Sequence, residues 1–177
     1  MRYAAIVMIA FAAHAAAQAP SPAEIDALYP AIEKFYIDLH QNPELAFQEV
    51  RTAAKLAEHA KALGYEVTTG VGKTGIVAVM KNGAGPTVML RTELDALPVE
   101  EKTNLPFASK VTTKNAAGQT IHVMHACGHD VHMSAWAGTA RWMAEHKDRW
   151  HGTLMLIGQP AEEGGSGGAL AMLKDGL

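Results

Sequence analysis

The apolar residues of this chain recur in two kinds of pattern, helical spacing and short continuous runs. Helical spacing places an apolar residue at every third or fourth position and is typical of helices that pack one face on a core. It predicts four helices, over residues 22–41, about 47–63, 131–147 and 169–174. Ser21, Pro22 and Glu24 have the order of an N-cap, a first-turn proline and a capping-box glutamate, which predicts where the first helix begins.

The short apolar runs predict buried strands that alternate with these helices. They lie at residues 65–69, where apolar and polar residues alternate, and at residues 76–80, 87–90, 121–124 and 153–157. Asn82-Gly83 is a turn signal between the second and third runs, and the polar residues 100–119 contain no predicted element. Helices interleaved with apolar strands indicate one α/β domain built on a layered sheet.

Acidic residues follow two of these strands. Glu93 and Asp95 come after the run at 87–90, and Glu162 and Glu163 come after the run at 153–157. Open α/β sheets bind their ligands at the carboxyl ends of strands. Because neighbouring side chains point in different directions, one glutamate of the pair could bind a metal while the other faces a metal-bound water. Taken alone, the pair also fits a solvated acidic loop, and Glu93 also fits an exposed acid at a strand end.

Cys127 and His129 are the second candidate group. In an extended segment, residues two apart project to the same side, so the thiolate and the imidazole could meet at one ion. Gly128 between them permits a close backbone approach. Sulfur and imidazole nitrogen suit zinc and other borderline divalent ions. The pair alone also fits a buried cysteine beside a histidine at a helix start.

Three further polar residues flank this pair. We expect Asp130 to cap the helix that follows, in preference to accepting a ring N–H from a ligand histidine. We expect His125 and His132 to contact the ligands or the substrate without binding metal themselves.

The composition of the chain argues against some classes of function. The chain has 177 residues, of which 49% are apolar, enough for one globular core. Its net charge is -3 and it has no basic stripe, which predicts no binding to nucleic acid or to an anionic membrane. The single cysteine cannot form an internal disulfide, which favours a metal-binding or reactive role in an oxidising compartment.

The first residues resemble an export signal. Met1-Arg2 supplies a short basic start, Ala4–Ala13 is apolar, and Ala17-Gln18-Ala19 is a small-x-small cleavage site. The apolar stretch is shorter than the roughly 20 residues that span a bilayer, although an N-terminal anchor or a buried helix is the alternative. We therefore expect a cleaved signal peptide over residues 1–19, a hydrolase domain over 20–177, and a periplasmic or secreted protein.

Three long motifs resemble a known family. RTELDALPVEE (91–101), MHACGHDVH (124–132) and QPAEEGGSGGALAML (159–173) closely resemble the co-catalytic metal amidohydrolases. This family includes aminoacylases, hippurate hydrolases and the plant auxin-conjugate (IAA-amino acid) hydrolases. LHQNPELAFQE (39–49) is similar to the segment that joins two helices near the start of those proteins, and the resemblance extends from about residue 30 to residue 177.

The resemblance implies a three-layer α/β/α aminopeptidase-like (zinc-peptidase) catalytic domain with a small lid domain inserted in it. It implies two divalent ions, which can be zinc, manganese, cobalt or nickel. Carried over by position, Cys127, His129 and Glu163 would be metal ligands and Glu162 the general base. Asp95 would be a supporting acid near the site.

The implied activity is that of a metal-dependent amidohydrolase acting on N-acyl amino acids or related small peptide-like amides. A metal-bound water would attack the amide carbonyl with Glu162 as general base. Family members are much longer and place their remaining metal-binding histidines and lid beyond the position of Leu177. We therefore expect an N-terminal fragment with residual metal binding and little activity, and a homodimer for the full-length protein.

One position departs from the family pattern, and one rival mechanism stays open. Relatives usually carry aspartate where this chain has Glu93, so the charge is kept and moved by one methylene. The rival is a cysteine hydrolase with Cys127 as nucleophile and a nearby histidine as base. A chelator would abolish metal-dependent hydrolysis and spare the thiol reaction.

Overall fold

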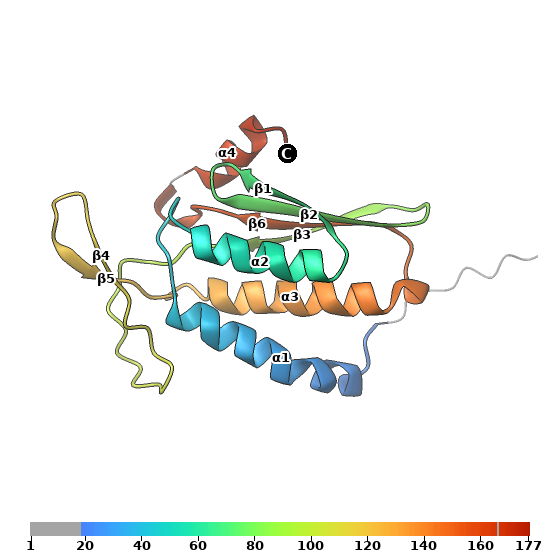
Figure 1. Ribbon diagram of the computed structural model, residues 1–177, viewed down its shortest axis with the longest axis horizontal. Coiled ribbons are helices and arrows are strands. Elements are labelled where there is room, and N and C mark those ends of the chain that lie inside the picture. Colours follow the sequence, from blue (N-terminus) through green and yellow to red (C-terminus); the bar gives the residue numbers. More distant parts are fainter. Residues whose placement is uncertain (1–18, 166) are drawn as a thin grey trace, which may run out of the picture.

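A four-stranded mixed sheet lies at the centre of the computed structural model, which describes residues 19–165 and 167–177 (Figure 1). Its strands, in spatial order, are β1 (Glu66–Val71), β2 (Gly75–Asn82), β6 (Gly152–Gln159) and β3 (Thr87–Glu93). β1, β2 and β6 are antiparallel neighbours, whereas β3 runs parallel to β6 with Glu93 opposite Gln159. Because β3 and β6 end at the same edge, the acidic segments that follow them are brought together.

Three helices lie on one side of this sheet, two of them packed directly on it. They are α1 (Pro22–Gln41), α2 (Val50–Ala62) and α3 (His129–Glu145). α2 packs on β1 and β2, α3 packs on β3, and α1 lies outside α3 (Figure 1). The short helix α4 (Gly168–Lys174) lies on the other side of the sheet, so the helices and sheet have the α/β layering predicted from the sequence.

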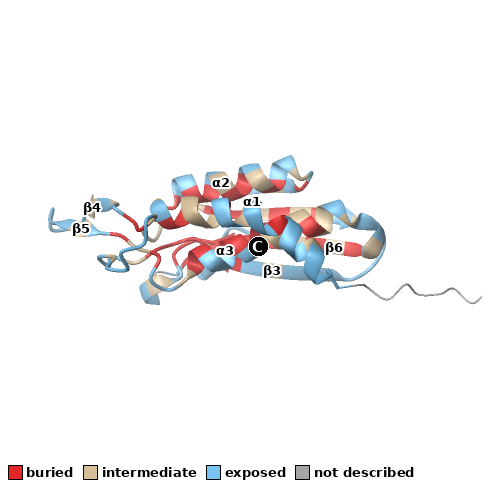
Figure 2. Cartoon of the chain, turned by 90° about the horizontal axis from the view of Figure 1, so that it is seen from below, coloured by how far each residue is buried: buried red, intermediate tan, exposed pale blue. Residues whose placement is uncertain are grey.

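The core lies between the helices and the sheet. Its largest fully buried apolar side chains come from every layer and include Leu39, Leu56, Ile76, Trp136 and Leu156. Figure 2 shows β6 and the adjoining part of α3 as buried, and the outer turns of α2 as exposed. The helices follow the periodicity prediction, because each of α1, α2 and α3 buries residues at helical spacing, and β6 has the continuous burial expected of its apolar run.

The predicted start of a helix is confirmed where the sequence contains a specific capping signal. α1 begins with the predicted capping box: the Ser21 hydroxyl accepts from the Glu24 N–H at 3.3 Å, and the Glu24 carboxylate accepts from the Ser21 N–H at 2.7 Å. α2 begins at Val50 and not near Phe47, because Phe47 has a φ of 60° and cannot join a right-handed helix.

A small hairpin was not predicted, although its second strand overlaps the strand expected at residues 121–124. Strands β4 (Thr112–Lys114) and β5 (Thr120–His122) pair in antiparallel fashion and are largely exposed. They carry no apolar alternation, and their turn is held by the Asn115 side chain, which accepts from the Ala117 and Gln119 N–H groups, both at 3.0 Å. The hairpin therefore rests on turn chemistry that a periodicity argument does not detect. Two single 3₁₀ turns, η1 (Lys147–Arg149) and η2 (Glu163–Gly165), complete the elements.

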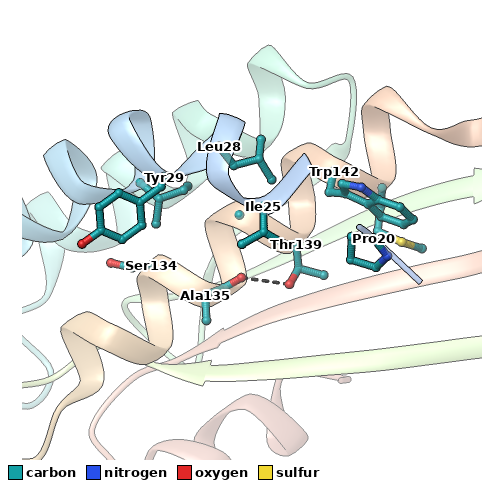
Figure 3. Close-up of a pocket in the computed structure, with 11 residues that line it drawn as sticks. Pro20, Ile25, Leu28, Tyr29, Ser134, Ala135, Thr139 and Trp142 are labelled. Carbon is teal, nitrogen blue, oxygen red and sulfur yellow. Dashed lines mark hydrogen bonds between the residues drawn. The ribbon is translucent and has the colours of Figure 1, made fainter. Parts of the chain in front are cut away.

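An apolar groove of about 520 Å³ lies between the first half of α1 and α3 (Figure 3). Pro20, Ile25, Tyr29 and Trp142 are among the side chains that line it. The Thr139 hydroxyl on its floor donates to the Ala135 carbonyl at 2.9 Å, so this polar group is already satisfied within the helix. The groove contains none of the residues predicted to bind metal.

The predicted export signal lies almost entirely outside the described part of the chain, because residues 1–18 are not described. Within residues 19–165 and 167–177, no helix combines the length and the apolar character needed to cross a bilayer. Cleavage of the signal and export of the protein stay predictions.

Candidate metal centre

The three predicted metal ligands meet at the edge where β3 and β6 end. One ligand atom each from Cys127, His129 and Glu163 lie within 4.8 Å of one another. Nε2 of His129 is 3.9 Å from Oε1 of Glu163. A thiol sulfur, an imidazole nitrogen and a carboxylate oxygen form the donor set that borderline divalent ions such as zinc prefer. The residues present therefore fit such an ion, both in chemistry and in spacing.

Cys127 and His129 converge in a way that differs from the prediction. Gly128 has a φ of 85° and is the N-cap of α3, and His129 is the first residue of that helix. The segment is therefore a turn into a helix and not an extended strand. A left-handed conformation suits glycine because it has no Cβ, and this turn, in place of strand alternation, directs both side chains to the same point.

Asp130 was expected to cap this helix, and that prediction is wrong. It lies inside the first turn of α3, two residues after the N-cap Gly128. Its Oδ2 atom is 2.6 Å from Nδ1 of His40, and its Oδ1 accepts from the Val131 N–H at 2.9 Å. Asp130 thus contacts a histidine from α1 that is not one of the predicted ligands.

His40 is held between two carboxylates. Its Nε2 lies 3.1 Å from Oε1 of Glu101, on the side opposite Asp130. Burial alone would lower the pKa of His40, but the hydrogen bonds to Asp130 and Glu101 outweigh burial and raise it. When the ring is protonated it donates from both nitrogens, so it links α1, the start of α3 and the loop that contains Glu101.

The orientation of His129 is set by Asp95. Nδ1 of His129 is 2.7 Å from the carbonyl oxygen of Asp95. A carbonyl can only accept, so Nδ1 carries the proton and the lone pair of Nε2 faces Glu163 and Cys127. The ring is almost fully buried, which leaves it little freedom to turn.

The Asp95 side chain performs a second task. Its Oδ1 accepts from the Glu162 N–H at 3.0 Å and its Oδ2 accepts from the Glu163 N–H at 2.9 Å. Its side chain is buried, so these bonds are protected from water. One aspartate therefore fixes the backbone of both glutamates and the ring of the histidine.

Glu162 and Glu163 do not diverge as predicted. Oε2 of Glu162 lies 3.7 Å from Nε2 of His129, so both carboxylates approach the same nitrogen. The backbone is not extended here, because Ala161 has a φ of 47° and η2 begins at Glu163, so strand alternation does not apply. The two differ in exposure instead: the Glu162 side chain is 41% exposed and the Glu163 side chain 20%.

The carboxylates make Cys127 a weak nucleophile. The pKa of its thiol is raised, first by a hydrogen bond to Glu163, then by burial and by the charges of Glu163, Glu162 and Glu93. Nucleophilic cysteines need a lowered pKa and a positive environment. This environment attracts a cation, which disfavours the cysteine-hydrolase alternative.

The remaining predicted residues border the cluster. Oε2 of Glu93 is 3.1 Å from Nδ1 of His132, and its Oε1 is 2.6 Å from Nη2 of Arg91. His125 is buried, and burial lowers the pKa of its ring to about 4. Its Nε2 makes no hydrogen bond within the part of the chain that the structure describes. None of Glu93, His125 and His132 belongs to the cluster of possible ligands found in that part.

Two contributing residues were missed from the sequence. His40 lies in a helix at an ordinary core-facing position, and Glu49 stands just before α2 like many exposed helix-start acids. Glu49 is in fact fully buried, and its Oε1 accepts from the Ala161 N–H at 2.8 Å. Since Ala161 is 112 residues away in the chain, no local pattern indicates this contact.

A comparison with protein families matches the part of the chain that forms this cluster. The model of peptidase family M20/M25/M40 matches residues 89–177, which contain all five predicted site residues. The chain belongs to this family.

Relatives in the M20 family extend the match toward the N-terminus. The chain is 44% identical over 155 residues to a hippurate hydrolase of Campylobacter jejuni, covering 87% of this chain and 37% of that protein. It is 41% identical over 139 residues to an N-acetyl-L-cysteine deacetylase of Bacillus subtilis, covering 78% of this chain and 31% of that protein. The chain therefore spans only about a third of the length of these curated relatives.

A solved M20 structure has the same fold. The YXEP protein of Bacillus subtilis, described as a dinuclear metal binding peptidase of the M20 family, is 38% identical with a TM-score of 0.74. The match covers 85% of this chain and 40% of that one. The predicted aminopeptidase-like catalytic domain is thereby confirmed for the part that the chain contains.

Proposed function

We propose that this chain supplies part of the active site of a metal-dependent amidohydrolase acting on N-acyl amino acids or related small peptide-like amides. The observation that carries the proposal is the meeting of the Cys127, His129 and Glu163 ligand atoms within 4.8 Å. The names of the M20 relatives, a hippurate hydrolase and an N-acetyl-L-cysteine deacetylase, support a small N-acylated substrate.

Cys127, His129 and Glu163 would hold metal in this proposal. The dinuclear neighbour supports two divalent ions. The resemblance implies zinc, manganese, cobalt or nickel, and among these the thiolate and imidazole favour zinc. When bound, such ions lower the pKa of a water molecule to about 7 and polarise the amide carbonyl.

Glu162 would move the proton. Its carboxylate lies beside the predicted ligands yet is twice as exposed as that of Glu163, so water and substrate can reach it. It takes a proton from the attacking water as the new C–O bond forms. It then returns that proton to the amine nitrogen as the C–N bond breaks, which releases the acyl group as a carboxylic acid.

Asp95 would position these groups without touching the substrate. Through its carbonyl it holds His129 in the tautomer that leaves Nε2 free to bind metal. Through its carboxylate it holds the Glu162 and Glu163 N–H groups, and thus the distance between the base and the ligand.

The experiment is a metal analysis followed by a substrate panel. We expect the purified protein to contain or take up divalent metal, and the enzyme to hydrolyse N-acetyl or N-benzoyl amino acids. EDTA should abolish this activity, and an added divalent ion should restore it. Activity that survives EDTA and is lost on thiol alkylation would instead support the cysteine-hydrolase mechanism.

The lengths of the relatives support a second proposal, that these 177 residues alone bind metal but hydrolyse substrate poorly. Three ligands hold two ions weakly, and we propose a homodimer for the full-length protein. Hydrolysis by the purified 177-residue chain at the rate of the Campylobacter relative would refute this.

We also propose export through cleavage after Ala19, which N-terminal sequencing of protein recovered from the periplasm or medium would test.

A further inference from the structure

Three consecutive backbone N–H groups, those of Ala161, Glu162 and Glu163, are bound by two buried carboxylates. Asp95 binds the second and third, and Oε1 of Glu49 binds the first at 2.8 Å. Both carboxylates are almost inaccessible to solvent. The turn that presents the proposed base and the proposed ligand is therefore anchored from two sides.

Both carboxylate oxygens of Glu49 accept hydrogen bonds, one of them from this turn. Its Oε1 accepts from Ala161, and its Oε2 accepts from the Thr74 hydroxyl. A buried carboxylate is costly unless its oxygens are hydrogen-bonded, and these two bonds use one oxygen each. Thr74 lies in the turn between β1 and β2, so Glu49 ties the start of α2 to two other loops.

The backbone around Glu49 is held in an uncommon conformation at three non-glycine positions. Phe47 has a φ of 60°, Lys73 a φ of 83° and Ala161 a φ of 47°. The Lys73 ammonium lies 4.0 Å from the centre of the Phe47 ring, which connects two of these positions directly. Left-handed conformations of this kind persist only where the surrounding contacts impose them, and they are concentrated at functional sites.

We propose that Glu49 is a positioning residue of the metal centre. The Glu49 carboxylate accepts from the Ala161 N–H and thereby keeps Ala161 in its left-handed conformation. The direction of the chain at Ala161 in turn sets where the Glu162 and Glu163 side chains point. Glu49 is bonded to the backbone of this turn and not to the metal ligands themselves, so its effect on metal is transmitted through the turn. The inference rests on the proposed function, since it concerns the same site.

The test uses four variants of the chain and Co²⁺ as the only added ligand. Glu49→Ala removes both acceptor oxygens, and Glu49→Asp keeps the charge but withdraws the oxygens by one methylene. Glu49→Gln keeps an oxygen for Ala161 and can donate its amide to the Thr74 oxygen, so it is the rescuing change. Glu58→Ala, at an exposed glutamate within α2, is the matched control.

The primary readout is the charge-transfer absorption of a cobalt–thiolate bond at Cys127, titrated to give the Co²⁺ affinity. We expect Glu49→Ala and Glu49→Asp to weaken Co²⁺ binding by about 10–100-fold, the range seen when residues that orient ligands are lost. Glu49→Gln and Glu58→Ala should bind close to wild type. Circular dichroism confirms that each variant is folded, and Glu49→Asp decides the question if Glu49→Ala does not fold.

A second readout is hydrogen exchange of the Ala161 amide in the metal-free chain. We expect protection in the wild type and in Glu49→Gln, and fast exchange in Glu49→Ala or Glu49→Asp. Wild-type Co²⁺ affinity in a folded Glu49→Asp, or an Ala161 amide that stays protected in it, would overturn the inference. If the wild-type enzyme hydrolyses no amide while both readouts behave as expected, the proposed function fails and the positioning role stands.

Discussion

Asp95 and His129 are joined by one hydrogen bond, 2.7 Å long, from the ring Nδ1 to the backbone carbonyl. The bond fixes which nitrogen of the histidine is free to bind a metal. The same aspartate binds the backbone of Glu162 and Glu163 through its side chain. Asp95, just after β3, therefore carries the framework of the site, whereas the first residue of α3, the loop before it and the segment after β6 carry the proposed ligands.

Asp95→Asn should weaken metal binding even though Asp95 is not a proposed metal ligand. The amide NH₂ would face one of the two backbone N–H groups that the carboxylate now binds, so one hydrogen bond becomes a repulsive contact. We expect a loss of about 1–3 kcal/mol in the free energy of unfolding and a zinc affinity lower by about 10–100-fold. Urea unfolding and calorimetric titration measure the two effects. Asp26→Asn, at an exposed position of α1, is the control and should change neither.

Glu162→Gln should separate chemistry from metal binding. Glutamine keeps the shape of the side chain but cannot take a proton, so kcat should fall by about 10²–10⁴-fold. Metal content should stay at the wild-type level, because Glu162 is the proposed base and not a proposed ligand. Glu163→Gln should instead lower the metal content, because Glu163 is a proposed ligand, and activity should fall as a consequence of the lost metal. Equal loss of metal in both variants would contradict the assignment of separate roles.

The stability of the metal-free protein should depend on pH through His40 and Glu101. The pKa of His40 is raised, so its contribution is complete below its usual value of 6.5 and is lost as pH rises through the raised value. Burial alone would raise the pKa of Glu101, but hydrogen bonds from Thr103, His40 and Ser109 lower it. Its contribution is therefore complete above 4.5 and is lost as pH falls through the lowered value.

The window of full stabilisation by this pair thus lies between about pH 4.5 and 6.5. His40→Gln should lower the free energy of unfolding there by about 1–3 kcal/mol and should flatten the decline above pH 6.5. Urea denaturation at a series of pH values measures both effects. His151→Gln, at an exposed position before β6, is the control. A decline above pH 6.5 that is equally steep in His40→Gln and wild type would assign it to other groups.

Periodicity and strand-end chemistry were enough to predict the main helices and strands of the sheet and the acidic residues at its edge, whereas the set of Cys127, His129 and Glu163 as ligands was implied only by the family resemblance. Capping chemistry at Ser21 and the apolar runs act locally, and local signals can be read from a sequence. The parallel pairing of β3 with β6 then brings Asp95 beside Glu162, as the strand-end argument requires.

The details that escaped prediction depend on backbone turns and on distant partners. Gly128 and Ala161 take left-handed conformations, and these replace the extended geometry expected around Cys127 and between the two glutamates. Asp130 has a helix-cap residue type, yet its partner His40 comes from a helix 90 residues earlier. Contacts of this kind arise only when the packed layers bring α1, α3 and the loops together.

The most direct test of the account is the absorption spectrum of the Co²⁺-loaded chain compared with that of its Cys127→Ser variant. If sulfur, imidazole and carboxylate share one ion, the wild type shows a cobalt–thiolate charge-transfer band. The band is then absent from Cys127→Ser and strongly weakened at equal Co²⁺ concentration in His129→Ala. A wild-type chain that binds Co²⁺ without this band, or a band of equal strength in Cys127→Ser, would contradict the proposed metal centre.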